Sequence, residues 1–225
     1  MFIVLEGLDG AGKSTQLKKL SAYLATRQIK SEFIHFPRFN TPVWGELIAK
    51  FLRGDLGDIN AVNPYIAGLI YAGDRYDASA QIKQWIAQGS CVLADRYVYS
   101  NIAYQCAKVS DEAARKILRD WILHTEYHYF NIPQPTLTLF LDVPFRHVEK
   151  KLGEERTGEE RSYLQGKKDI HETNLNLQQC VREIYRAQEK LDANFRLIDC
   201  ADNDAMLSPD VIFEKIIHHI HTLIR

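Results

Sequence analysis

The stretch that decides the fold lies at the start of the chain, where residues 2–15 read Phe-Ile-Val-Leu-Glu-Gly-Leu-Asp-Gly-Ala-Gly-Lys-Ser-Thr. Residues 2–5 form an apolar run typical of a buried strand. Gly7 to Ser14 match the pattern G-x-x-x-x-G-K-S/T, and leucines recur at helical spacing over residues 17–24. A glycine-rich turn between a strand and a helix points backbone N–H groups at phosphate oxygens, and the helix adds the positive end of its dipole. The sequence therefore predicts a triphosphate site.

The residue types of this loop also predict what each position contributes. Lys13 is expected to reach the β and γ phosphates of the bound triphosphate, and the Ser14 hydroxyl to bind Mg²⁺. The glycines let the backbone turn closely around the phosphates. The residues expected to bind the donor nucleotide are Gly7, Asp9, Gly10, Ala11, Gly12, Lys13, Ser14 and Thr15.

Four further apolar runs along the chain predict strands. They lie at residues 32–36, 91–94, 136–141 and 195–198. Helical patterns lie between them, at roughly 64–88, 111–130, 170–193 and 209–224. Short apolar strands alternating with helices predict an α/β fold, with a five-stranded parallel sheet and helices on both faces. The length of 225 residues suits a single domain spanning residues 1–225.

Composition narrows the class of partner. The formal net charge is -1, and charged residues make up 25% of the chain. This balance offers no basic surface for nucleic acid or for a membrane. The first residues lack the positive segment and the length of a signal peptide, and no apolar run is long enough to span a bilayer. We therefore expect a cytoplasmic protein that binds neither nucleic acid nor membrane.

Three arginines predict a second anion site close to the first. Arg38 follows the strand expected at 32–36, Arg96 follows Asp95 at the end of the next strand, and Arg75 lies in a helix. In parallel sheets ligands gather at the carboxyl ends of the strands. Guanidinium groups match phosphate and carbonyl oxygens. A triphosphate site beside a monophosphate site indicates a kinase.

Several segments resemble the thymidylate kinase family. The glycine-rich loop carries an aspartate, Asp9, as in that family, and 36–38 (Phe-Pro-Arg), 74–75 (Asp-Arg) and 95–97 (Asp-Arg-Tyr) resemble its acceptor-site motifs. Residues 99–105 resemble the segment that follows. The resemblance extends from residue 1 to about 190. It implies a P-loop kinase fold and phosphorylation of dTMP to dTDP by ATP with Mg²⁺.

The resemblance also implies roles for individual residues. Arg38 and Arg96 would hold the acceptor phosphate, Arg75 would donate to thymine O4, and Asn101 would read the base edge. Tyr71 would stack on thymine, Tyr104 would crowd the ribose 2′ position, and Phe36 would pack against the nucleoside. The expected acceptor-site residues are Asp9, Phe36, Arg38, Tyr71, Arg75, Arg96, Asn101, Tyr104 and His171, where the family often has tyrosine in place of His171. The expected Mg²⁺ residues are Asp9, Ser14, Asp95 and Glu172.

A polar segment at about 153–168 predicts a lid. It contains three glycines and repeats Gly-Glu-Glu-Arg. Thymidylate kinases carry a catalytic arginine either in the P-loop or in the lid, and the matching P-loop position here is Gly10. The resemblance therefore implies that Arg156 or Arg161 supplies it, beside Lys13, Asp9 and Arg96. Such an arginine contributes about 10³–10⁵ in rate.

Other functions remain open at this point. A deoxynucleoside kinase would use a carboxylate such as Asp95 as a base, and another deoxynucleoside monophosphate kinase would differ only in the base that it reads. A non-catalytic nucleotide switch is disfavoured because the chain lacks the Asn-Lys-x-Asp segment that reads guanine. The family resemblance further implies a homodimer, formed through the helices at 64–88 and 111–130.

Overall fold

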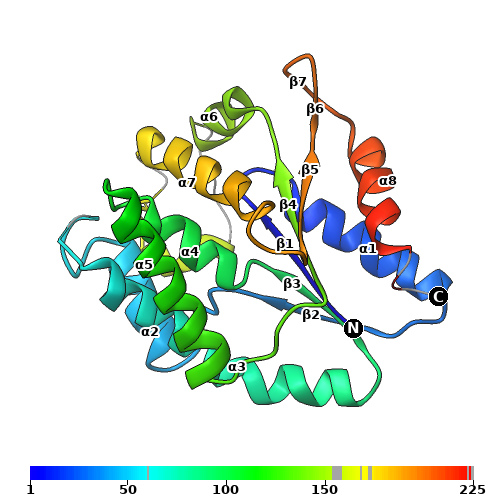
Figure 1. Ribbon diagram of the computed structural model, residues 1–225, viewed down its shortest axis with the longest axis horizontal. Helices are drawn as coiled ribbons and strands as arrows, with labels where there is room; N and C mark the ends of the chain where they lie inside the picture. The colour runs from blue at the N-terminus through cyan, green and yellow to red at the C-terminus, as the bar shows by residue number, and fades with distance from the viewer. Residues whose placement is uncertain (60, 154–158, 168, 172–173, 222, 224–225) are drawn as a thin grey trace.

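The computed structural model describes residues 1–59, 61–153, 159–167, 169–171, 174–221 and 223, with the backbone alone at 159–161. Its centre is a parallel five-stranded sheet in the order β2-β3-β1-β4-β5 (Figure 1). The strands are β1 (Phe2–Gly7), β2 (Ser31–His35), β3 (Cys91–Asp95), β4 (Leu137–Asp142) and β5 (Phe195–Asp199). The predicted five-stranded parallel sheet is confirmed, with each boundary within two residues.

Helices cover both faces of the sheet, which gives three layers. On one face α1 (Lys13–Thr26) packs against β1, β2 and β3, and α8 (Pro209–Ile220) packs against β5. On the other face lie α3 (Pro64–Ala87), α4 (Val98–Cys106) and α7 (Leu175–Gln188). Outside α3 and α4 are α2 (Trp44–Leu52) and α5 (Glu112–Leu123), and α6 (Phe145–Gly153) follows β4 (Figure 1). The predicted α/β class is confirmed.

Some predicted helices differ in extent, and three were not predicted. The helix expected at 170–193 spans only Leu175–Gln188, because Asn174 caps its start by accepting a hydrogen bond from the Leu177 N–H. The helix expected at 111–130 changes at residue 124 into a π-helical turn, His124–Tyr129. Helices α2, α4 and α6 were missed, as was a short hairpin of β6 (Ala201–Asp202) and β7 (Ala205–Met206).

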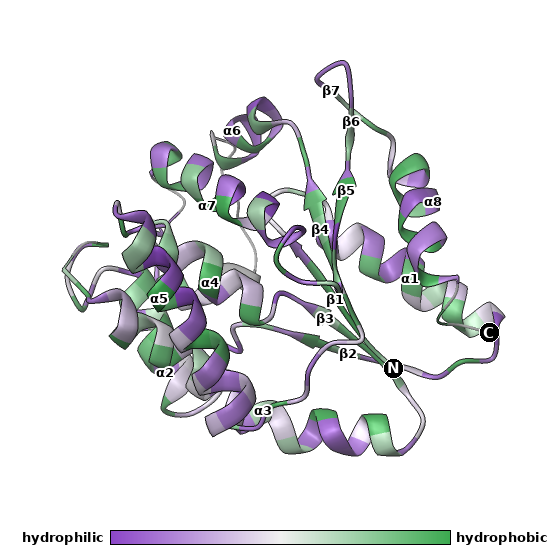
Figure 2. Ribbon diagram, in the orientation of Figure 1, coloured by the Kyte–Doolittle hydropathy of each residue, from purple (hydrophilic) through white to green (hydrophobic). Residues whose placement is uncertain are grey.

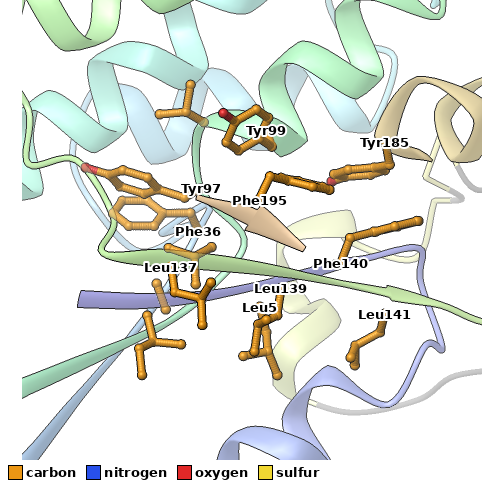
Figure 3. Packing of buried hydrophobic residues seen from close by; sticks show 14 of the residues in the cluster. Leu5, Phe36, Tyr97, Tyr99, Leu137, Leu139, Phe140, Leu141, Tyr185 and Phe195 are labelled. Carbon is orange, nitrogen blue, oxygen red and sulfur yellow. The ribbon is translucent and has the colours of Figure 1, made fainter. Parts of the chain in front are cut away.

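The core lies between the sheet and the helices. All residues of β1, β3 and β4 are buried. Most of them are apolar, as the colouring of these strands in Figure 2 shows. Aromatic rings fill the layer beneath α4 and α7 (Figure 3): Tyr185 stacks on Phe140 with centroids 4.6 Å apart, and Tyr97 meets the edge of Phe2 at 5.1 Å. Each such burial contributes about 1.5–3 kcal/mol. The described part of the chain has no helix both long enough and apolar enough to cross a bilayer.

Buried Glu6 connects this core to the edge of the sheet. Its carboxylate accepts hydrogen bonds from the backbone N–H of Tyr97 (2.9 Å) and Ser100 (3.1 Å), and from the Tyr185 hydroxyl (2.9 Å). A buried carboxylate is tolerated only when its oxygens are paired in this way. The network fixes the start of α4 over the end of β1, where two predicted anion sites meet.

Candidate active site

The loop after β1 has the backbone that a phosphate cradle requires. Gly10 (φ 79°) and Gly12 (φ 85°) are left-handed, a conformation that costs glycine little. A Cβ on Gly7 would lie 3.0 Å from the Ala11 Cβ, so the loop closes tightly on itself. Helix α1 begins at Lys13, which places its N-terminus at the loop. The geometry suits a phosphate group surrounded by backbone N–H donors.

Lys13 lies over this loop and is buried. Its Nζ is 3.3 Å from the carbonyl oxygens of both Gly7 and Leu8, and 3.8 Å from Asp95 Oδ1. Burial lowers the pKa of Lys13, with a further contribution from the positive charge of Arg96. A bound phosphate would provide the charge partner that this ammonium needs.

The predicted Mg²⁺ residues that the structure describes offer oxygen donors, as a hard divalent cation prefers. Ser14 is exposed at the start of α1, and Asp95 ends β3 beside Lys13. Asp95 Oδ1 is buried and, among the described residues, lacks a hydrogen-bond partner. Burial opposes ionisation of Asp95, but Lys13 and His35 outweigh it and lower the pKa. These residues fit a magnesium ion; Glu172 lies outside the described residues.

The predicted acceptor-site residues, apart from Arg38, all line one cavity at the carboxyl edge of the sheet. These are Asp9, Phe36, Tyr71, Arg75, Arg96, Asn101, Tyr104 and His171. They come from the loop after β1, the end of β2, α3, the end of β3, α4 and the segment before α7. The cavity thus gathers motifs that are far apart in the sequence.

Arg96 forms the boundary between the cavity and the phosphate loop. Its Nη2 donates to Asp9 Oδ1 at 2.8 Å and its Nη1 to the Ser100 hydroxyl at 3.2 Å. Burial alone would lower the pKa of Arg96, but Asp9 raises it well above the usual value. The backbone of Arg96 is left-handed (φ 67°), an uncommon and costly conformation for a side chain of this size.

Arg38 does not turn to the cavity. Its Nε donates to Asp74 Oδ1 at 2.8 Å, and its Nη2 donates to the Asp74 carbonyl at 2.7 Å and to Asp77 Oδ2 at 2.6 Å. Two carboxylates on α3 therefore hold this guanidinium, which sequence reasoning did not foresee. The expected phosphate contact of Arg38 remains a prediction.

At the far end of the cavity a buried carboxylate, Glu126, orients two of the predicted residues. Arg75 donates to it through Nε at 2.5 Å and Nη2 at 2.7 Å. Burial would lower the pKa of Arg75, and Glu126 raises it instead. Asn101 Nδ2 donates to Glu126 Oε1 at 3.0 Å and to the Gly68 carbonyl at 2.9 Å. Both partners accept hydrogen bonds, so they fix the NH₂ end of the Asn101 amide on their side. The other end, Oδ1, is a buried acceptor with no partner among the described residues.

Gln105 lines the same end of the cavity and was missed from the sequence. It is fully buried, and its Oε1 accepts a hydrogen bond from Lys108 Nζ at 2.9 Å. Its Nε2 is a buried donor without a partner among the described residues. Gln105 could have been predicted from its position four residues after Asn101, because side chains at this spacing lie on the same face of a helix.

Aromatic side chains form the walls of the cavity. Tyr104 stacks on His171 with centroids 4.9 Å apart, and its hydroxyl donates to Asp9 Oδ2 at 3.3 Å. Phe51 meets the edges of both Tyr71 and His171. Burial lowers the pKa of His171 well below its usual value, so the imidazole is neutral, and its Nε2 has no partner in the described part of the chain.

The segment predicted as a lid lies partly within the described residues. Glu159–Leu164 form a 3₁₀ helix that contains Arg161, whereas Arg156 lies outside the described residues. Tyr163 stacks on Phe39 at 3.6 Å, and Arg53 Nη1 donates to the Tyr163 carbonyl at 2.7 Å. These contacts seat the 3₁₀ helix on the loop after β2 and the end of α2, at the rim of the cavity.

Comparisons with known proteins agree with this arrangement. A family model described as thymidylate kinase matches residues 5–213. The thymidylate kinase of Mycobacterium tuberculosis (strain H37Rv) is 31% identical over 185 residues, 82% of this chain and 84% of that protein. That of Plasmodium falciparum (isolate 3D7) is 29% identical over 150 residues, 67% of this chain and 65% of that protein.

A solved structure shares the fold over nearly the whole chain. It is a thymidylate kinase from Candida albicans, an enzyme described as having broad substrate specificity. The two structures superpose with a TM-score of 0.72 at 27% identity, covering 99% of this chain and 91% of that chain. With the family match over residues 5–213, these findings show that the chain belongs to the thymidylate kinase family.

Proposed function

We propose that this protein transfers the γ-phosphoryl group of ATP to dTMP, giving dTDP and ADP. The observation that carries the proposal is the hydrogen bond between Arg96 and Asp9, 2.8 Å long, which joins the acceptor cavity to the phosphate loop. A donor phosphate held near Lys13 and an acceptor phosphate held by Arg96 would then lie on either side of Asp9. Phosphoryl transfer depends chiefly on such positioning and on neutralising charge.

The phosphate of dTMP is already an anion, so no strong base is needed. Lys13 neutralises charge on the transferred group, and Arg96 holds the acceptor phosphate through its guanidinium fork. Arg38 does not line the cavity in this structure, so to bind that phosphate, as proposed, its guanidinium would have to turn away from Asp74 and Asp77. Mg²⁺, bound with Ser14, Asp9 and Asp95, would draw negative charge from the phosphate oxygens; Glu172 is proposed to help place it.

The far end of the cavity offers the hydrogen-bonding complement of thymine. Thymine presents a donor, N3–H, between two carbonyl acceptors. Asn101 supplies the acceptor Oδ1, Gln105 supplies the donor Nε2, and Arg75 supplies Nη1, which Glu126 does not use. Cytosine carries an unprotonated N3 and an amino group, so it would leave buried groups unpaired. Such a mismatch costs roughly 1–3 kcal/mol per group.

The walls of the cavity complete the acceptor site. Tyr71 stacks on the base, and Phe36 packs against the nucleoside. Tyr104 and His171, which are stacked on each other, enclose the ribose and leave little room for a 2′-hydroxyl. Lid closure over 153–168 brings Arg156 or Arg161 to the transferred phosphoryl group and excludes water, which would otherwise accept it.

The active protein is proposed to be a cytoplasmic homodimer of single-domain subunits. Apolar side chains are exposed on the outer face of α3, at Ile66, Leu69 and Tyr76, and on and after α5, at Ile117 and Tyr129. Exposed apolar groups clustered on neighbouring helices favour burial against a second copy.

The experiment that tests the proposal is an ADP-release assay with ATP, Mg²⁺ and each acceptor in turn. The acceptors are dTMP, dUMP, dCMP, dAMP, dGMP and thymidine. We expect ADP release with dTMP, at least tenfold slower release with dCMP and the purine nucleotides, and none with thymidine. Turnover of thymidine at the rate of dTMP would instead indicate a deoxynucleoside kinase with Asp95 as base, and ATP turnover independent of acceptor would overturn the proposal.

A further inference from the structure

A hydrogen bond behind the cavity determines which end of the Gln105 carboxamide is left without a partner in the described part of the chain. Lys108 lies just beyond α4, and its Nζ donates to Gln105 Oε1 at 2.9 Å. An ammonium group has donors only, so it can pair with the carbonyl end of a carboxamide but not with the NH₂ end. Rotating the carboxamide by half a turn would place NH₂ against NH₃⁺.

The other end of Gln105 is consequently presented as a donor. Nε2 is buried, lacks a partner among the described residues, and belongs to a side chain that lines the cavity. A buried, unpaired amide donor is costly in the free protein and is satisfied when a carbonyl oxygen enters. The neighbouring Asn101 is oriented the opposite way by Gly68 and Glu126, so the two amides present different atoms.

Lys108 is itself held in place by packing. Its Nζ lies 4.7 Å from the centroid of the Phe51 ring on α2, within the range of a cation–π contact. Phe51 also meets the edge of His171, the ionisable neighbour on the segment before α7, which is neutral because it is buried. Lys108 is therefore fixed between α4 and α2 behind the cavity wall and does not line the cavity itself.

We propose that Lys108 is a positioning residue for base recognition: its ammonium group orients the Gln105 carboxamide so that Nε2 donates to a carbonyl oxygen of the thymine base. The inference rests on the proposed function, because it assumes dTMP in this cavity. Lys108 acts through Gln105 and makes no contact with the nucleotide.

Loss of the Lys108 proton would remove the constraint. A neutral amine carries a lone pair and can accept from Nε2, so both orientations of Gln105 become available. Burial lowers the pKa of Lys108 to about 8. The oriented state is present below that pH and is lost as the pH rises through it, so dTMP binding should weaken between pH 7 and pH 9.

Calorimetric measurement of the Kd of dTMP on the full chain, from pH 7 to pH 9, tests the inference. For the unmodified protein Kd is expected to rise about fivefold over this range. Lys108→Arg keeps donors at every pH, so its Kd should stay flat. Lys108→Met keeps the apolar stem but no donor, so its Kd should be about tenfold higher throughout, with kcat within about twofold. Lys116→Met, which removes an exposed lysine on α5, is the matched control and should match the unmodified protein.

A double substitution separates this role from a purely structural one. In a Gln105→Met background the carboxamide is absent, so adding Lys108→Met should not raise Kd further. Additive losses, or tight binding by the single variant Lys108→Met, would overturn the inference. If Lys108→Met does not fold, the inference is overturned when the Kd of the unmodified protein is as independent of pH as the Kd of Lys108→Arg. Failure of the unmodified protein to bind or phosphorylate dTMP would instead count against the proposed function.

Discussion

At the residue scale, Arg96 joins the two halves of the site. Its left-handed backbone follows directly from β3 and donates its N–H to the Leu5 carbonyl on β1 at 2.9 Å. This backbone conformation directs the Arg96 side chain across the end of the sheet, where it meets Asp9. Strain at such a position persists only where the surroundings determine it, and here Asp9 and Ser100 hold the guanidinium.

Arg96→Lys is predicted to lower kcat/KM for dTMP by roughly 10²–10³, because an ammonium cannot form the two directed contacts of the guanidinium fork. Steady-state kinetics would measure this effect, with thermal unfolding as a check that the variant is folded. Arg146→Lys offers a matched control at an exposed arginine on α6, which pairs with Asp204 and does not line the cavity. A folded Arg96→Lys protein with kcat/KM within threefold of the unmodified protein would contradict the role of Arg96.

The residues of the site differ in how far the sequence reveals them. Arg96, Asn101 and Tyr104 lie in short segments that resemble motifs of the family, so the resemblance was enough to select them. Glu126 could not be selected, because its partner Arg75 is 51 positions away and only the folded chain brings them together. The pairing of Arg38 with Asp74 and Asp77 depends on the same long-range packing and was likewise unforeseen.

At the element scale, helix α3 carries much of the acceptor site on one side and meets α2 on another. Gly73 allows that second contact, since the ring of Trp44 occupies the space where a Cβ would stand, with ring atoms at 2.5–2.6 Å. Gly68, one and a half turns earlier, has its nearest neighbours at 3.6–3.7 Å from the same hypothetical Cβ. Close packing therefore requires a glycine at position 73 but not at position 68.

Gly73→Ala is predicted to destabilise the protein by about 1–3 kcal/mol through overpacking against Trp44. Gly68→Ala, with ordinary contacts and better helix propensity, is predicted to be neutral or to stabilise by up to about 1 kcal/mol. Urea unfolding of the two variants measures the difference. Equal effects on the free energy of unfolding would show that Trp44 moves aside and that the α2–α3 contact is not fixed by Gly73.

The missed helices show where sequence periodicity fails. Every residue of α4 except Ser100 is buried, so the helix has no polar face to produce a 3.6-residue pattern. The start of α7 was misplaced because the pattern before Asn174 resembles helix, whereas the cap fixes the boundary. Strands β1, β3, β4 and β5 were found because each is a short, largely apolar run that ends at a polar residue or a glycine. Strand β2 is more polar, and Pro37 marked where it ends.

At the scale of the whole molecule, the parallel sheet brings its loops to a single edge. The order β2-β3-β1-β4-β5 places β1 between β3 and β4, so the phosphate loop lies beside Asp95 and Arg96. The rule that ligands gather at the carboxyl ends of parallel strands was sufficient to predict this neighbourhood. The source of the catalytic arginine, Arg156 or Arg161, stays a prediction, because Arg156 lies outside the described residues and only the backbone of Arg161 is described.

The proposed dimer leads to a prediction at the same scale. Leu69→Glu, on the exposed face of α3, places a charge in the proposed interface and should shift the protein from dimer to monomer. Sedimentation equilibrium measures the mass, and Leu191→Glu, at an exposed leucine after α7, is the matched control. A monomeric unmodified protein, or a Leu69→Glu protein that remains dimeric, would exclude this interface.

The most direct test of the central claim follows the γ-phosphorus of ATP. With labelled ATP, Mg²⁺ and dTMP, the label is predicted to appear as the β-phosphate of dTDP, only when dTMP is present, and to be almost abolished by Lys13→Ala in a folded protein. Label released as inorganic phosphate at the same rate without dTMP, or transferred to dTMP equally well by Lys13→Ala, would contradict the account.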